Sequence, residues 1–195
     1  MHSEFKISDH VYNAIKEIDA DRRSCSDDSD QYPAAHLARI LSTVIRRDNQ
    51  WRVIGISENA LKCLADNNFE KPKKTIQRGH LVPRADVASF IFANRDEFIS
   101  KDEIETVLWF YDQTVLMTVD ENKDAHNTPD FYRFEFEDIS KVLFASAYIG
   151  HKYGKSEKNF IKMFHDQPDK RLVNIKDIYP DGLDTHLNHV DDFRN

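Results

Sequence analysis

The stretch "DQTVLMTVDENKDAH", residues 112–126, combines a predicted strand with a predicted helix. The apolar, partly β-branched run at residues 114–119 favours a strand. The polar run at residues 120–127 has helical spacing, and it begins at Asp120, a residue type that often caps helices. On such a helix Asn122 and His126 are four residues apart, so their side chains project from one face and can bind one cation. The stretch therefore predicts a strand that turns directly into a short helix with two metal-binding residues.

A second strand is predicted upstream, in "TIQRGHLV", residues 75–82. Pro83 follows, and because proline has no N–H to donate to a neighbouring strand, we expect the strand to end there. His80 lies near this end. A neutral imidazole whose pKa is close to working pH can take a proton from water, so His80 is a candidate general base.

Two strands and a helix that present one histidine and two helical ligands resemble the ββα-metal finger of HNH-type nucleases. The resemblance covers residues 75 to 127. It implies that His80 is the general base and that Asn122 and His126 bind one divalent metal ion, either Mg, Mn, Ni or Zn. Gln113 falls where the family has an asparagine that ties the loop of the finger.

The residues "QRGH", 77–80, are also similar to the "DRGH" found in the nonspecific nuclease branch of the same superfamily. Both resemblances imply that His80 is the base. In that branch the metal-binding asparagine lies on a differently spaced helix, so we prefer the HNH interpretation. One departure stands out: HNH proteins usually have a metal-binding histidine or aspartate directly before the base, and this chain has Gly79.

Basic residues surround the predicted base. Arginine can grip a phosphate through two parallel hydrogen bonds, which suits nucleic-acid binding. Four basic residues are predicted to contact nucleic acid: Arg78, Arg84, Lys73 and Lys74. Arg78 and Gln113 are also predicted to assist catalysis.

The composition limits the classes of partner. The chain has 195 residues and a formal net charge of -7, so attraction to nucleic acid has to come from a local basic face. Cys25 and Cys63 are far apart in the sequence and show no zinc-knuckle spacing, which fits a reducing cytoplasm best. No apolar run approaches the roughly 20 residues that span a bilayer, so we expect no membrane partner.

The fold class predicted from these patterns is α+β, mainly helical, with a central ββα-metal finger made of an antiparallel hairpin and its helix. We expect a helical N-terminal region at residues 1–70, a nuclease core with a helical insertion at 71–150, and a C-terminal extension at 151–195. A further strand is predicted at residues 51–56. The predicted helices, outside the finger, span residues 8–21, 34–47, 57–68, 85–94, 100–111 and 138–149.

The sequence thus predicts a metal-dependent HNH-type endonuclease that hydrolyses phosphodiester bonds, in DNA rather than RNA, as a restriction or defence enzyme does. A first alternative is a catalytically inactive HNH-like protein that binds nucleic acid or protein, which the acidic charge, Gly79 and Gln113 favour. A second alternative is an interaction module in which the motif arises by chance. It predicts that residues 80 and 122 lie far apart. A homodimer is expected if the target is palindromic duplex DNA.

Overall fold

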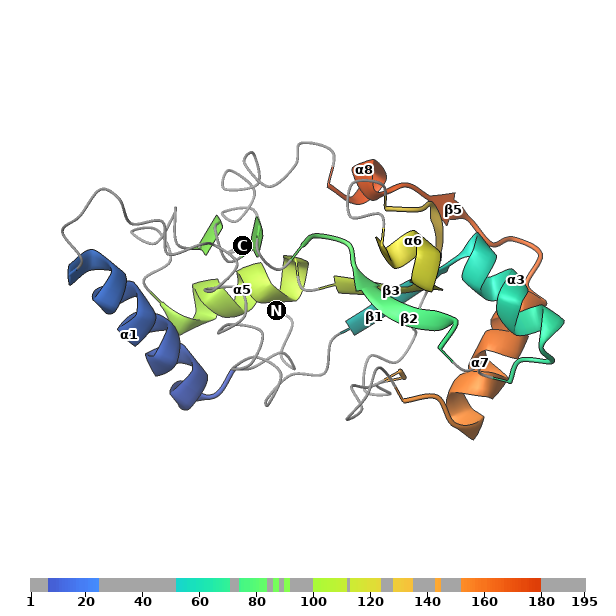
Figure 1. The fold of residues 1–195 in the computed structure, drawn as a ribbon, viewed down its shortest axis with the longest axis horizontal. Helices are drawn as coiled ribbons and strands as arrows, with labels where there is room; N and C mark the ends of the chain where they lie inside the picture. Colours follow the sequence, from blue (N-terminus) through green and yellow to red (C-terminus); the bar gives the residue numbers. More distant parts are fainter. Residues whose placement is uncertain are drawn as a thin grey trace. The chain divides into compact units, whose positions relative to one another are not determined.

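The computed structural model describes residues 7–24, 52–70, 74–83, 86–87, 90–91, 100–111, 113–123, 128–134, 143–144 and 152–179. The chain divides into two compact units (Figure 1). We call the first the helical unit, which consists of Met1–Asn49, Val82–Asp112 and Asp181–Asn195. The second is the sheet unit, which consists of Gln50–Leu81 and Gln113–Pro180.

The sheet unit contains a five-stranded mixed sheet with the strand order β2-β3-β1-β4-β5. Strands β1 and β3 are parallel, whereas β2 with β3, β1 with β4 and β4 with β5 are antiparallel. The sheet is larger than the predicted hairpin, since β4 and β5 correspond to no predicted strand. The bounds are β1 Arg52–Ser57, β2 Ile76–His80, β3 Gln113–Thr118, β4 Phe131–Arg133 and β5 Leu172–Val173.

Helix α3, Glu58–Asp66, follows β1 directly. Its cap is confirmed, because the Ser57 Oγ accepts a hydrogen bond from the Ala60 N–H at 3.1 Å. The helix ends where Asn68 and Phe69 adopt φ values of 51° and 60°, a left-handed conformation that an α-helix cannot continue. Three more helices belong to this unit: α6 Val119–Lys123, α7 Lys155–His165 and α8 Ile175–Ile178.

The core of the sheet unit lies between the sheet and the helix pair α3 and α7, which pack against each other. An aromatic group at its centre includes Phe134, Phe160 and Phe164, with the rings of Phe134 and Phe164 4.9 Å apart and edge to face. The buried cluster consists of Val53, Ile56, Ala60, Leu61, Leu64, Ile76, Leu116, Phe134, Phe144, Ile161 and Phe164. Burial of these side chains fixes α7 on the sheet.

The predicted helix at residues 138–149 is wrong where the structure describes it. Leu143 and Phe144 form a turn, and Phe144 has a φ of 58°, which no residue within a right-handed helix adopts. Phe144 instead packs into the core beside Phe134. The helix that packs there is α7, in a segment for which the sequence analysis predicted no helix.

The helical unit is built around α1, Asp9–Ser24, and α5, Lys101–Tyr111. Both predicted starts are confirmed. Ser8 Oγ accepts a hydrogen bond from the Val11 N–H at 3.2 Å, and the Ser100 N–H donates to Glu103 Oε2 at 2.9 Å in a capping box. Helix α1 ends at Ser24, three residues beyond the predicted end.

Two polar contacts join α5 to α1 and to the residues just before it: Lys101 Nζ lies 2.7 Å from Asp9 Oδ1, and the Ile7 N–H donates to Glu105 Oε1 at 2.9 Å. In the predicted helix at residues 85–94, the Pro83 carbonyl accepts hydrogen bonds from the Asp86 and Val87 N–H groups, as in a first helical turn. The rest of that segment, apart from residues 90–91, and the predicted helix at 34–47 lie outside the described residues. Within the described chain no helix is long and apolar enough to cross a membrane.

Candidate functional site

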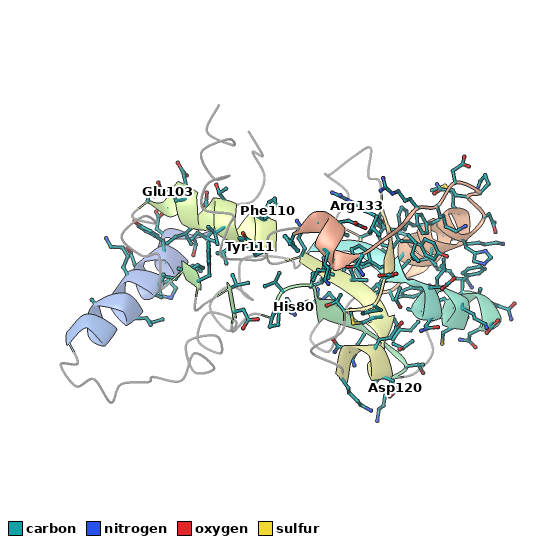
Figure 2. All side chains as sticks on the ribbon, turned by 90° about the horizontal axis from the view of Figure 1, so that it is seen from above. His80, Glu103, Phe110, Tyr111, Asp120 and Arg133 are labelled. Atoms are coloured by element: carbon teal, nitrogen blue, oxygen red, sulfur yellow. The ribbon has the colours of Figure 1, made fainter. Side chains whose placement is uncertain are left out.

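The predicted strand pair and helix are adjacent in space. Strand β2 runs antiparallel to β3, with Ile76 opposite Thr118 and His80 opposite Thr114, and α6 begins at the residue after β3. Two backbone hydrogen bonds extend the pairing beyond the strands, from the Val119 N–H to the Thr75 carbonyl at 2.9 Å and from the Leu81 N–H to the Gln113 carbonyl at 3.0 Å. Figure 2 shows His80 at the end of β2, and Asp120 on α6. These three elements form the candidate site.

Helix α6 is capped by Thr118, so the predicted cap at Asp120 is wrong. The Thr118 N–H and hydroxyl donate to Glu121 Oε2 at 2.8 and 2.9 Å, and the Glu121 N–H returns a hydrogen bond to Thr118 Oγ1 at 3.3 Å. This is a capping box, in which a threonine and the glutamate three residues later satisfy each other's backbone donors. Asp120 lies inside the first turn, where it forms an exposed ion pair with Lys123.

Glu121 also ties α6 to the junction of β1 and α3. The Ser57 hydroxyl donates to Glu121 Oε2 at 2.7 Å, and Asn59 Nδ2 donates to Glu121 Oε1 at 2.9 Å. Partial burial disfavours the charged carboxylate, but hydrogen bonds from Thr118, Ser57 and Asn59 outweigh it and lower the pKa of Glu121 below its usual value. Sequence reasoning missed this residue. The spacing of Thr118 and Glu121 could have revealed the cap, whereas no local signal indicates Ser57 as a partner.

Asn122 of α6 lies directly against Gly79 of β2. A Cβ atom at position 79 would come within 2.5 Å of Asn122 Oδ1 and 2.6 Å of Met117 Cε, both closer than a carbon atom can approach. Any side chain at position 79 would therefore require the Asn122 and Met117 side chains to move. This holds also for a metal-binding histidine or aspartate, which HNH proteins usually have there.

The side chains of His80 and Asn122 lie on opposite faces of β2. In an antiparallel pair, residues opposite each other share a face, and successive residues of a strand alternate. His80 thus shares the face of Thr114 and the core residue Leu116, while Gly79 faces Asn122. A substrate in contact with both the imidazole and the amide has to lie at the end of β2, where the strand stops.

Of the other predicted site residues, two are buried in the sheet, one is exposed and three lie outside the described residues. Arg78 and Gln113 are buried, with 9% and 7% of their surface exposed, on neighbouring strands. The Gln113 backbone carbonyl holds the residue after His80 through its bond to the Leu81 N–H. Lys74 is exposed, immediately before β2. His126, Arg84 and Lys73 lie outside the described residues.

The described donors limit which metal fits. No group of three or more His, Cys, Asp or Glu side chains in the described part of the chain is placed to bind an ion. Asn122 is the one predicted ligand that the structure describes, and an amide oxygen suits a hard cation such as Mg or Mn, which keeps several of its waters. Asn122 would be one ligand of a hydrated ion of this kind.

Searches of known protein families, of curated proteins and of solved structures gave no match to this chain.

Proposed function

We propose that this protein is a metal-dependent endonuclease of the HNH type, which hydrolyses phosphodiester bonds in nucleic acid and prefers DNA to RNA. The observation that supports the proposal most directly is the contact between Asn122, a predicted metal ligand, and Gly79, the residue directly before the predicted base His80. The side chains of Asn122 and His80 lie on opposite faces of β2, so the metal ion and the base would meet the substrate at the end of the strand. The order of two antiparallel strands followed at once by a helix also supports a ββα-metal finger formed by β2, β3 and α6.

In this proposal each group has a separate role. The His80 imidazole takes a proton from the attacking water, as a neutral imidazole can. Asn122 and His126 would hold the metal ion, which supplies stabilisation of the charge on the departing oxygen. Lys73 and the exposed Lys74 precede the base in the sequence, and Arg84 follows it. These three residues would contact phosphates of the substrate. Arg78 is buried in the sheet, so it is less accessible to a phosphate than the exposed Lys74.

A second candidate is an inactive HNH-like protein that binds nucleic acid or another protein. One observation favours it: position 79 is a glycine packed against the Asn122 and Met117 side chains, where active HNH enzymes usually have a metal ligand before the base. The acidic net charge of -7 favours it as well, because a nuclease has to attract a polyanion.

The experiment is cleavage of supercoiled plasmid and of single-stranded RNA with Mg, Mn, Ni or Zn, alongside an EDTA control. We expect metal-dependent nicking of the plasmid that falls by about 100-fold or more in His80→Ala, the usual contribution of a general base. The matched control is His10→Ala, which removes an exposed histidine of α1 and should cut normally.

Two results would count against the nuclease. Undiminished cutting by His80→Ala would remove the predicted base, and with it the HNH interpretation. No cutting by folded protein with any of the four metals and either substrate would favour the binding protein. Circular dichroism of each variant checks that a loss of activity does not come from unfolding.

A further inference from the structure

Helix α7 carries a row of three lysines on its outer face. Lys155, Lys158 and Lys162 are spaced by three and four residues, which places them on one side of a helix. The opposite side contains Ile161 and Phe164, which are buried in the core of the sheet unit. Lys155 and Lys162 are exposed and Lys158 is half-buried, so the row, which we call the α7 lysine row, faces away from the core.

The carboxylates of α7 do not neutralise this row. Glu157 is 2% exposed, and its Oε2 accepts a hydrogen bond from the Gly154 N–H at 2.8 Å as part of the helix cap. Asp166 pairs with His165 at 3.1 Å. Of the three lysines, Lys158 is the one that forms an ion pair within the described residues, with Glu70.

The segment around α7 is basic in an acidic protein. Residues 152–176 contain seven lysines and arginines but only three aspartates and glutamates, while the whole chain has a net charge of -7. A concentrated positive region on a negative protein attracts a polyanion locally where the overall field repels it. The region meets the requirement that the net charge imposes on any nucleic-acid partner.

The length of the row suits a nucleic-acid strand. Seven residues at about 1.5 Å per residue separate Lys155 from Lys162, a distance of about 10 Å. One strand of a duplex carries a phosphate charge every 3.4 Å or so along the axis, so the row spans about three phosphates. Helices that bind a membrane surface need a free apolar face, and the apolar face of α7 is already buried in the core. The geometry therefore favours nucleic acid over an anionic bilayer.

We infer that the α7 lysine row is a docking surface for the phosphate backbone of nucleic acid. The inference rests on the proposed function for the identity of the polyanion, and it adds a contact far in sequence from Lys73, Lys74, Arg78 and Arg84. Contacts of this kind hold the strand through charge and are independent of base sequence. The row holds the substrate on the sheet unit, on which β2 also presents His80.

The test measures binding without cleavage. A short fluorescent DNA duplex is titrated with protein that carries His80→Ala, in EDTA, over a series of salt concentrations. The variant Lys155→Gln/Lys162→Gln should weaken binding on the order of tenfold or more and reduce the slope of log K against log salt by about 2, since each lost phosphate contact removes about 0.9 from it. The matched control is Lys16→Gln/Lys62→Gln, which removes the same charge from exposed lysines of α1 and α3, outside the basic segment, and should leave the slope unchanged.

Equal effects of the two double variants would show that only net charge matters and would overturn the inference. So would an unchanged slope in the Lys155→Gln/Lys162→Gln variant, an absence of DNA binding, or a stronger row-dependent binding to phosphatidylserine vesicles than to DNA. The two proposals fail separately: cleavage with an unchanged slope removes the docking surface alone, whereas a reduced slope in a protein that never cuts removes the nuclease alone.

Discussion

Helices α6 and α7 both begin with a cap residue whose N–H donates to a glutamate, but they are held to the sheet by different forces. Each has a glutamate at its third position whose carboxylate accepts a hydrogen bond from the cap residue, Glu121 for Thr118 and Glu157 for Gly154. Helix α7 is eleven residues long and buries Ile161 and Phe164. Helix α6 is five residues long and buries none.

The difference shows where each helix is sensitive to change. Hydrophobic packing grows with buried area and has no preferred direction, so α7 is fixed by its inner face and its outer face is free to vary. Hydrogen bonds depend on distance and angle, so α6 is positioned by the few polar contacts of Glu121 and by its close approach to Gly79. The candidate site on α6 is therefore more vulnerable to single-atom changes than the lysine row on α7.

The largest effect should come from the inner face of α7. Phe164 is 5% exposed and contacts the ring of Phe134, so Phe164→Ala should lower the free energy of unfolding by about 3–5 kcal/mol. Urea unfolding followed by circular dichroism measures this. Met163→Ala, on the exposed face of the same helix, should change stability by less than about 0.5 kcal/mol. Similar losses in the two variants would mean that packing does not hold α7.

The next effect concerns the contact between α6 and β2. Gly79→Ala adds a methyl group where Asn122 Oδ1 would be 2.5 Å away, so the Asn122 and Met117 side chains have to shift, at a cost of about 1–3 kcal/mol in stability. Metal-dependent cleavage should fall as well, because the shift moves Asn122 away from the residue next to His80. Both unfolding and cleavage are measured, and full activity in Gly79→Ala would show that the close contact has no part in catalysis.

Two other glycines supply the controls. Gly55→Ala would meet the Tyr132 backbone carbonyl at 2.5 Å, which a side-chain movement cannot relieve, so it should lose more stability than Gly79→Ala but, at temperatures where it is folded, retain more activity. At Gly154 the nearest atom is 3.4 Å away, an ordinary contact, so Gly154→Ala should have a small effect on both. Equal loss of activity at positions 55 and 79 would indicate a general effect of instability.

Local signals predicted the elements that local chemistry determines. Ser8, Ser57 and Ser100 each cap a helix within three residues of themselves, and the sequence predicted all three starts. The strand at residues 114–119 was predicted from its apolar run, with a shift of one residue at each end. The cap of α6 was also encoded locally, but an aspartate was preferred to the threonine and glutamate that form the capping box.

Elements that depend on distant partners were not predictable in the same way. Strands β4 and β5 have three and two residues, too few for a periodic pattern, and each depends on a neighbouring strand for pairing, β4 on β1 and β5 on β4. The sequence around Phe144 has the spacing of a helix, yet the residue adopts a left-handed turn and its ring packs into the core. In the site, the resemblance to HNH nucleases was what predicted that Asn122 lies near His80. Nothing in the sequence predicted the hydrogen bond from Ser57 to Glu121, because it joins residues 64 positions apart.

The smallest expected effect is the pH-dependent stability that the Glu121 carboxylate contributes through its hydrogen bonds. Because the pKa of Glu121 is lowered on folding, its carboxylate contributes stability that is fully present above its unfolded pKa of about 4.3 and is lost as pH falls through the lower folded value. Glu121→Gln cannot titrate, and it should lower the free energy of unfolding by about 1 kcal/mol at neutral pH, the low end for charged hydrogen bonds because Glu121 is only partly buried. Urea midpoints between neutral and strongly acidic pH should therefore converge for the two proteins as pH falls below about 4, since other carboxylates titrate alike in both.

Asp120→Asn removes a charge from the same helix without these hydrogen bonds, and it should cost less at neutral pH because its exposed ion pair with Lys123 contributes little. A constant difference between wild type and Glu121→Gln at every pH would show that shape, not charge, holds α6, and would make α6 more like α7 than its contacts indicate.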